Sequence, residues 1–223
     1  MTGWVRVDCH LHTAVSGDAV TSLDELAERV EQERLDVVCI TDHNVTSAAV
    51  AAMERGIGAR VVVGEEIRTP DGDLIGLFLT ERIPYVLPLA EVTGRIRAQG
   101  GLIYLPHPFD QGRSSLGQVA GQLCEQGLAD IIEVFNAKID VPYSVVNSDA
   151  NPNRQAELLA ARYGLPGAAG SDAHDPEGIG AAYLEMPDFD GPREFLTQLA
   201  FAEITGEYRP HAVRYPRRLA GPG

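Results

Sequence analysis

The sequence predicts an α/β fold, a barrel of mostly parallel strands with helices packed around it. Short apolar segments alternate with amphipathic segments of helical length along the 223-residue chain, which is typical of a parallel sheet covered on both faces. About seven such strands are expected, a number that suits a barrel and is slightly short for an eightfold one. No linker or change of composition divides the chain, so we expect a single domain over 1–223, irregular from about 209.

Continuous apolar runs predict the strands, and apolar residues at helical spacing predict the helices. Ser22 and Glu25 have the spacing of a capping box, which marks the start of a helix, and Gly56 ends the next one. The sequence Pro70-Asp71-Gly72 predicts the turn of a hairpin. In chain order we expect strand 4–9, helix 22–35, strand 36–41, helix 45–56, strand 60–67, hairpin 68–80, helix 88–99, strand 102–107, helix 116–126, strand 130–136, helix 153–163, strand 167–172, helix 192–199 and a final strand at 202–205.

Composition excludes several classes of protein. The net charge of −14 argues against a broad binding surface for nucleic acid or for an anionic membrane. No apolar run is long enough to span a bilayer, and the N-terminus lacks the features of a secretory signal, so we expect a cytoplasmic protein. Cys9, Cys39 and Cys124 are far apart in sequence and show no CxxC spacing, so we expect buried thiols and no disulfide. No glycine-rich phosphate-binding loop is present.

Histidines gather at the ends of the predicted strands. Only His211, in the tail, lies elsewhere. Since the carboxyl ends of parallel barrel strands open on one face, these side chains are expected to meet there. The five histidines that follow strands are His10, His12, His43, His107 and His174.

Carboxylates repeat this pattern. Glu65 and Glu66 end the third strand, and because strand faces alternate only one of them can point toward the histidines. His10 and His12 are two residues apart, so both imidazoles project to one side of an extended strand and can reach one ion. Imidazole with carboxylate suits zinc, manganese or iron, and without cysteine ligands a closed structural zinc site is not expected.

Six segments carry a resemblance to a known family. In order, "DCHLHT", "TDHN", "GEEI", "LPHPF", "EVFNA" and "GSDAH" resemble the motifs of the PHP superfamily, the polymerase and histidinol phosphatase domains. The likeness runs from Asp8 to His174. It implies a distorted (β/α)7 barrel, a cluster of two or three divalent ions (manganese, zinc or iron) and hydrolysis of phosphoesters by a hydroxide that the ions activate.

The resemblance also implies roles for single residues. His10 and His12 would bind a first ion with Asp172, Glu66 would bridge the first and second ions, and His107 would bind the second. Asp8 would orient a ligand imidazole. The residues expected to act in catalysis through the ions are Glu66, Asp172 and His174. The expected ligands of a third ion are His43, His174 and Asp18.

One position departs from the family pattern. Many relatives carry a histidine in the hairpin that follows the glutamate, whereas this chain has Asp73 in "GDLIGLF". Asp73 is either an additional ligand of the second ion or a solvated turn residue, and in the second case that ion is held more loosely.

The expected substrate is a small phosphorylated metabolite, most simply a phosphomonoester such as a nucleotide or the phosphate of a sugar or amino alcohol. Arg113 and Lys138, the only lysine of the chain, follow predicted strands and are candidate phosphate contacts. Asn136, at the end of the strand before Lys138, is expected to touch the substrate or a metal ligand. With few aromatic residues and no basic groove, no nucleic-acid polymer and no membrane is expected as a partner.

Two alternatives remain open. Amidohydrolase-type barrels also begin with a His-x-His pair and cleave C–N or C–O bonds, in which case Lys138 would bridge two ions. A non-catalytic accessory domain, as in some polymerase-associated relatives, is the other alternative.

Overall fold

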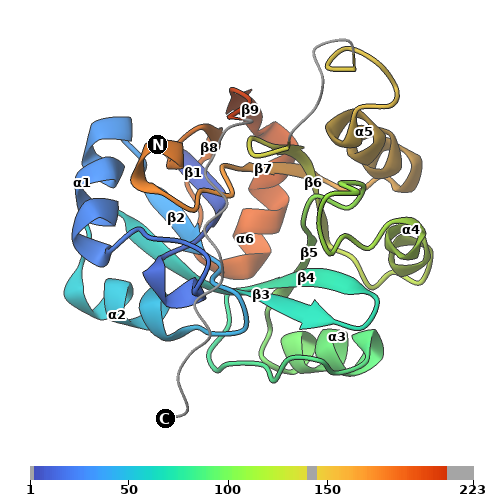
Figure 1. Cartoon of the computed structure of the whole chain (residues 1–223), viewed down its shortest axis with the longest axis horizontal. Helices are drawn as coiled ribbons and strands as arrows, with labels where there is room; N and C mark the ends of the chain where they lie inside the picture. The colour runs from blue at the N-terminus through green and yellow to red at the C-terminus, as the bar shows by residue number, and fades with distance from the viewer. Residues whose placement is uncertain (1–2, 140–144, 210–223) are drawn as a thin grey trace.

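The computed structural model describes residues 3–139 and 145–209 (Figure 1). In these two ranges the strands form one mixed sheet in the order β7-β6-β5-β4-β3-β2-β1-β8-β9. Their bounds are β1 Trp4–Leu11, β2 Val37–Ile40, β3 Arg60–Thr69, β4 Gly72–Leu77, β5 Leu102–Leu105, β6 Ile131–Asn136, β7 Gly167–Gly170, β8 Ala182–Pro187 and β9 Glu203–Gly206.

The sheet curls so far that β7 returns to β1. The backbone N–H of Asp172 donates to the carbonyl of His10 over 2.7 Å, and Leu11 forms an isolated parallel bridge with Ala173. These contacts bring together the two strands that stand furthest apart among β1 to β7 in the sheet order. The predicted α/β barrel is confirmed, and it is nearly closed.

Two antiparallel additions interrupt the parallel barrel. β3 and β4 pair as the predicted hairpin, in which Thr69 lies opposite Gly72. β8 runs antiparallel to β1 and was not predicted, although Ala182, Leu184 and Met186 alternate with less buried neighbours in the pattern of a strand. The strand expected at 202–205 is β9, which pairs with β8.

The helices follow the predicted order and surround the strands. Ser22 and Glu25 form the predicted capping box at the start of α1. The irregular tail predicted from about 209 lies, apart from Arg209, outside the described residues. The helices are α1 Leu23–Glu33, α2 Ser47–Arg55, α3 Leu89–Ala98, α4 Gln118–Glu125, α5 Pro152–Tyr163 and α6 Gly191–Gln198, with 3₁₀ turns at Ala14–Ser16, Pro176–Gly178 and Leu199–Phe201.

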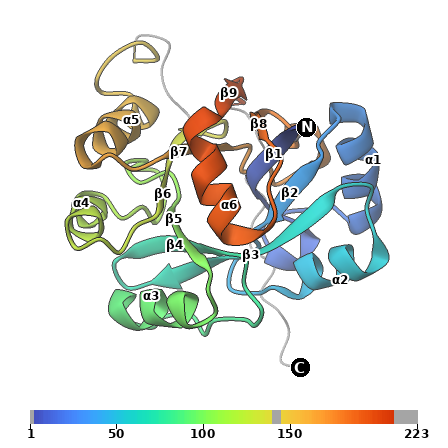
Figure 2. The same ribbon diagram turned by 180° about the vertical axis from the view of Figure 1, so that it is seen from behind.

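Alternating strand residues build two cores, an outer one between the strands and the surrounding helices and an inner one on the opposite face of the strands. One face of β2 and β5, with Val38 and Ile103, packs with the apolar sides of the surrounding helices. The opposite face, with Cys39 and Tyr104, packs with Phe195 of α6. Figure 2 shows α6 lying across the centre of the ring of strands, so this helix covers one end of the inner core. The polar side chains at the carboxyl ends of the strands therefore rest on a closed apolar floor.

The three cysteines are free and buried. Cys9 and Cys39 belong to the inner core, whereas Cys124 belongs to the outer one. Among the described residues, no helix is both long enough and apolar enough to cross a membrane.

Candidate metal centre

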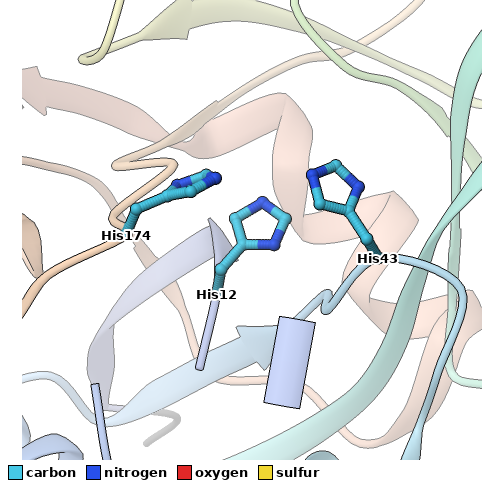
Figure 3. Close-up of side chains that lie close together, drawn as sticks. All are labelled: His12, His43 and His174. Carbon is cyan, nitrogen blue, oxygen red and sulfur yellow. The ribbon is translucent and has the colours of Figure 1, made fainter. Parts of the chain in front are cut away.

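Three loops bring imidazoles together above the inner core. His12 follows β1, His43 follows β2 and His174 follows β7, and their rings point toward one another (Figure 3). The ring centroids of His12 and His174 are 4.3 Å apart, and those of His12 and His43 are 4.7 Å apart. The His12 N–H donates to the carbonyl of Ala173 and the His43 N–H donates to the side-chain Oγ of Ser16, so these hydrogen bonds tie the loops to one another.

A second group lies beside this one and shares His12 with it. Nε2 of His10 and Nε2 of His12 are 3.1 Å apart. Oε2 of Glu66 lies 3.6 and 3.3 Å from these two nitrogens, and Oδ1 of Asp172 lies 3.7 and 3.4 Å from them. All four side chains are almost fully buried. The structure thus brings together the residues predicted to hold the first ion.

Glu66 occupies the centre of the whole arrangement. Its Oε1 lies 3.2 Å from Nε2 of His107, and its Oε2 lies 3.1 Å from Nδ1 of His43. Burial acts to raise the pKa of Glu66, but His43 and hydrogen bonds from His10, His107 and His12 hold it well below its usual value. A charged carboxylate with histidines on both oxygens has the geometry that a bridge between ions requires.

Asp18 lies close to His43 and His174, the two histidines with which it was predicted to hold a third ion. Oδ2 of Asp18 lies 3.2 Å from Nε2 of His43, and its Oδ1 lies 3.9 Å from Nε2 of His174. Burial acts to lower the pKa of His174, and the charges of His12 and Lys138 lower it further, so this imidazole stays neutral. Neutral imidazole is the form that binds a metal ion.

Asp73 is not a solvated turn residue. It lies on β4, is 4% exposed, and belongs to a convergent group with His43 and Glu66. The Nε of Arg68 lies 3.5 Å from Oδ1 of Asp73, an ion pair that the sequence did not suggest. Burial, together with the charge of Glu66, raises the pKa of Asp73. Its carboxylate converges with ligand atoms of His43 and Glu66, so an ion on the His43 side of the centre would compete with Arg68 for it.

Asn136 contacts a predicted ligand, the second of the two contacts expected of it, and is too deeply buried to line the cavity. Its amide donates to Oε2 of Glu133 and to Oδ2 of Asp172. One sequence expectation needs correction. Asp8 was expected to orient an imidazole, but it accepts hydrogen bonds from the backbone N–H groups of His10 and Ser171 instead. An irregularity in β1 after Asp8 breaks the alternation on which that expectation depended.

A cavity of about 360 Å³ opens above the ligand groups. Arg113 contacts Oδ2 of Asp172 and lies 3.1 Å from Oδ2 of Asp110, while Nζ of Lys138 lies 3.9 Å from Oδ1 of Asp172. Arg68 is a third cation at this cavity. The lining residues are Asp18, His43, Glu66, Arg68, Asp73, His107, Gly112, Arg113, Ser114, Lys138, Asp172 and His174.

These side chains fit divalent cations. Oδ1 of Asp172 is buried without a hydrogen-bond partner in the described part of the chain, and it faces imidazole nitrogens. The two Nε2 atoms of His10 and His12 present lone pairs to each other unless one carries a proton, and a cation between them satisfies both. Within each convergent group the ligand atoms lie within 4.8 Å of one another: His12, His43 and His174; His10, His107 and Asp172; His10, His12 and Glu66; His43, Glu66 and Asp73.

Two family models and a relative show what the chain is similar to. The PHP domain model matches residues 8–92, and the PHP-associated model matches residues 145–204. An uncharacterised protein of Methanocaldococcus jannaschii is 36% identical over 205 residues, which are 87% of this chain and 79% of that protein. The chain belongs to the PHP family. The resemblance of the six sequence motifs is thereby confirmed.

Two other similar proteins are longer than this chain. The DNA polymerase III PolC-type of Caldanaerobacter subterraneus subsp. tengcongensis is 31% identical over 137 residues, which are 60% of this chain and 8% of that polymerase. Among solved structures, a two-domain protein of Bacteroides vulgatus containing a predicted PHP-like metal-dependent phosphoesterase is similar with a TM-score of 0.73 at 16% identity. That similarity covers 92% of this chain and 65% of that protein, and at this identity it shows that the barrel is shared.

One carboxylate at the PHP centre was not singled out by the sequence analysis. Glu133 lies in the middle of β6, in the quoted segment "EVFNA", with apolar residues on both sides. Its Oε1 lies 2.9 Å from Nδ1 of His10, and its Oε2 accepts the backbone N–H of His107 over 2.6 Å. A lone glutamate in an otherwise apolar strand was the available signal, because a buried carboxylate needs partners.

Gly170 makes room for this contact, which yields a prediction. A Cβ at residue 170 would lie 2.3 Å from Cβ of His10 and 2.9 Å from Oε1 of Glu133. We expect Gly170→Ala to lower the free energy of unfolding by about 1–3 kcal/mol, as for other overpacked cores, and to weaken ion binding. Denaturant unfolding and ion titration measure the two effects. Gly94→Ala is the control: it meets nothing within 4 Å in the middle of α3 and should stabilise the protein slightly. Equal stability of the two variants would contradict the prediction.

Proposed function

We propose that this PHP protein is a metal-dependent phosphoesterase acting on a small phosphorylated metabolite, a phosphomonoester such as a nucleotide or the phosphate of a sugar or amino alcohol. The observation that carries the proposal is the convergence of buried histidines and carboxylates at the floor of a cavity with cationic walls. Two or three ions of manganese, zinc or iron would be held by His10, His12, Asp18, His43, Glu66, Asp73, His107, Asp172 and His174.

The bound ions would supply a hydroxide nucleophile near neutral pH and positive charge opposite the phosphate oxygens. The chain's own residues do the rest. Asp110 lies against Nε of Arg113 and so orients its guanidinium at the cavity. Lys138 adds a point charge on the same side, beside Asp172. Once ions compensate the charge of Asp172, both cations are in position to bind the oxygens of a phosphate dianion.

The cavity and the charge of the protein favour small substrates. A volume of about 360 Å³ lies within the usual range for small-molecule sites. The net charge of −14 leaves the cationic wall as a local feature, which disfavours a nucleic-acid polymer or a membrane as partner. We accordingly propose a small metabolite as the substrate, and for the protein a cytoplasmic location and a single catalytic domain.

The test is release of inorganic phosphate from a panel of phosphorylated metabolites and from p-nitrophenyl phosphate. The ion-free protein is supplied in turn with manganese, zinc or iron(II). We expect hydrolysis that a chelator abolishes and fresh ions restore, and that Asp172→Ala lacks.

Two other results would overturn the proposal. Hydrolysis of amides or lactones without phosphate release would support an amidohydrolase-like enzyme with Lys138 at the ions. Ion binding without hydrolysis of any substrate would support an accessory domain.

A further inference from the structure

Glu133 is a buried carboxylate in the middle of β6 that has four hydrogen bonds. It is 0% exposed, and each of its oxygens accepts two hydrogen bonds. Nδ1 of His10 and the hydroxyl of Tyr104 meet Oε1 over 2.9 and 3.0 Å. The backbone N–H of His107 and the amide of Asn136 meet Oε2 over 2.6 and 2.9 Å. Both oxygens thus face hydrogen-bond donors, which is the environment of a carboxylate that accepts only.

The amide of Asn136 extends this network to a third predicted ligand. Its Nδ2 also donates to Oδ2 of Asp172 over 3.0 Å. Glu133 and Asn136 thus contact His10, His107 and Asp172, which together form one of the convergent ligand groups. The ring nitrogens of His43 and His174 contact Asp18, Glu66 and Asp172 in the described part of the chain, and neither Glu133 nor Asn136.

Two of these ligands need support from their surroundings. His107 has a φ of 27° and Asp172 a φ of 50°. Both values are positive, which residues other than glycine rarely adopt. Such conformations persist where neighbouring contacts fix them. The N–H of His107 is fixed by Glu133, and the carboxylate of Asp172 is fixed by Asn136.

We propose that Glu133 and Asn136 are the positioning pair for one ion of the cluster, the ion held by His10, His107 and Asp172. The inference rests on the proposed metal centre and names the residues that set the geometry of one position within it. Neither residue contacts the ion or the substrate. Both act by holding ligands, so loss of either one weakens this ion selectively.

The chemistry of His10 shows why a carboxylate is required. An imidazole that binds an ion through Nε2 must carry its remaining proton on Nδ1. A charged carboxylate accepts only, so Glu133 imposes the Nδ1–H form and leaves Nε2 of His10 free of a proton when an ion binds. That Nε2 is the atom that faces His12, Glu66 and Asp172.

The substitution Glu133→Gln preserves shape and removes this property. A carboxamide has one accepting oxygen and one donating nitrogen, whereas both oxygens of Glu133 face donors. Whichever way the amide turns, its NH₂ group meets donors. If that group faces Nδ1, His10 must accept there and carry its proton on Nε2, where it blocks the ion.

Glu65 provides a matched control. It is also 0% exposed, but its Oε2 accepts the N–H of Ile83 and its nearest cation, Nε of Arg82, lies 4.0 Å away. Glu65→Gln replaces a buried carboxyl group on β3 whose side chain contacts no predicted ligand. A general effect of losing a buried carboxylate would appear in both variants, whereas a positioning effect appears only at residue 133.

The experiment is calorimetric titration of the ion-free proteins with manganese and with zinc, together with their unfolding midpoints. Wild type and Glu65→Gln are expected to bind ions alike. In Glu133→Gln one binding step should weaken by about 10–100-fold, the range measured for lost outer partners of metal ligands, while the other steps keep their affinity. Asn136→Ala should weaken the same step, and Tyr104→Phe should weaken it less, because Oε1 keeps His10.

Unchanged binding in Glu133→Gln, or an equal loss at every step, would overturn the inference. If Glu133→Gln does not fold, Asn136→Ala and Tyr104→Phe decide by the same criterion. Ion binding is measured without substrate, so the two proposals can fail separately. If the wild type hydrolyses no phosphoester but Glu133→Gln still loses one binding step, only the proposed function is refuted.

Discussion

Replacing Glu66 by alanine is expected to remove ion binding and phosphoester hydrolysis together, with kcat lower by about a thousandfold or more, equivalent to roughly 4 kcal/mol of transition-state stabilisation. The reason is geometric. Oε2 of Glu66 lies within 3.6 Å of nitrogens of His10, His12 and His43, and Oε1 lies 3.2 Å from His107. Glu66 belongs to two of the convergent ligand groups, so its loss affects more than one ion position.

The neighbouring residue again supplies the control. Glu65→Gln changes the adjacent side chain, which points out of the cluster, and should retain full metal content and activity. Metal content by atomic spectroscopy and phosphate release by a colorimetric assay report the two properties separately. Full metal content with lost hydrolysis in Glu66→Ala would show that the side chain acts on the substrate instead and would refute its role as a bridge.

The fold was predictable wherever a local pattern determined it. Apolar runs and caps located the parallel strands and the helices, and the Pro-Asp-Gly turn located the hairpin between β3 and β4. β8 was missed although its apolar residues alternate, because so short a run does not show that it pairs with β1, at the opposite end of the chain. An antiparallel strand at that position depends on pairing between distant segments, which no single stretch of sequence encodes.

The candidate site was predictable in its composition and only partly in its contacts. Histidines at strand ends share one face of a barrel, so their meeting followed from topology. The role of Glu133 did not follow, because it depends on a donor from β1, another from β5 and the loop after β5. Arg68 was missed because only the structure shows that it lies against Asp73 at the cavity.

Binding of divalent ions is expected to stabilise the protein strongly. An ion at about 100 times its dissociation constant adds roughly 2.7 kcal/mol to the free energy of unfolding, which for a chain of this size raises the melting temperature by about 5–10 °C. The physical source is the buried carboxylates of Glu66 and Asp172, whose negative charge a cation offsets, and Oδ1 of Asp172 in particular, which has no hydrogen-bond partner in the described part of the chain. Thermal melts with and without chelator measure the change, and Glu66→Ala should show none of it.

The stabilisation by ions should also grow as pH rises from about 6.5 to 9. Burial opposes protonation of His10, but Glu133 and Glu66 raise its pKa to about 9 in the ion-free protein, above the value near 6.5 of an unfolded histidine. The extra proton stabilises the ion-free fold fully below pH 6.5, and this contribution is lost as pH rises through 9. An ion at Nε2 of His10 must displace that proton, so it competes less well at low pH. The check is to measure melting temperatures with and without a fixed concentration of free manganese at several pH values in this window. The difference between the two should increase as pH rises. A constant difference would mean that His10 carries no proton for the ion to displace.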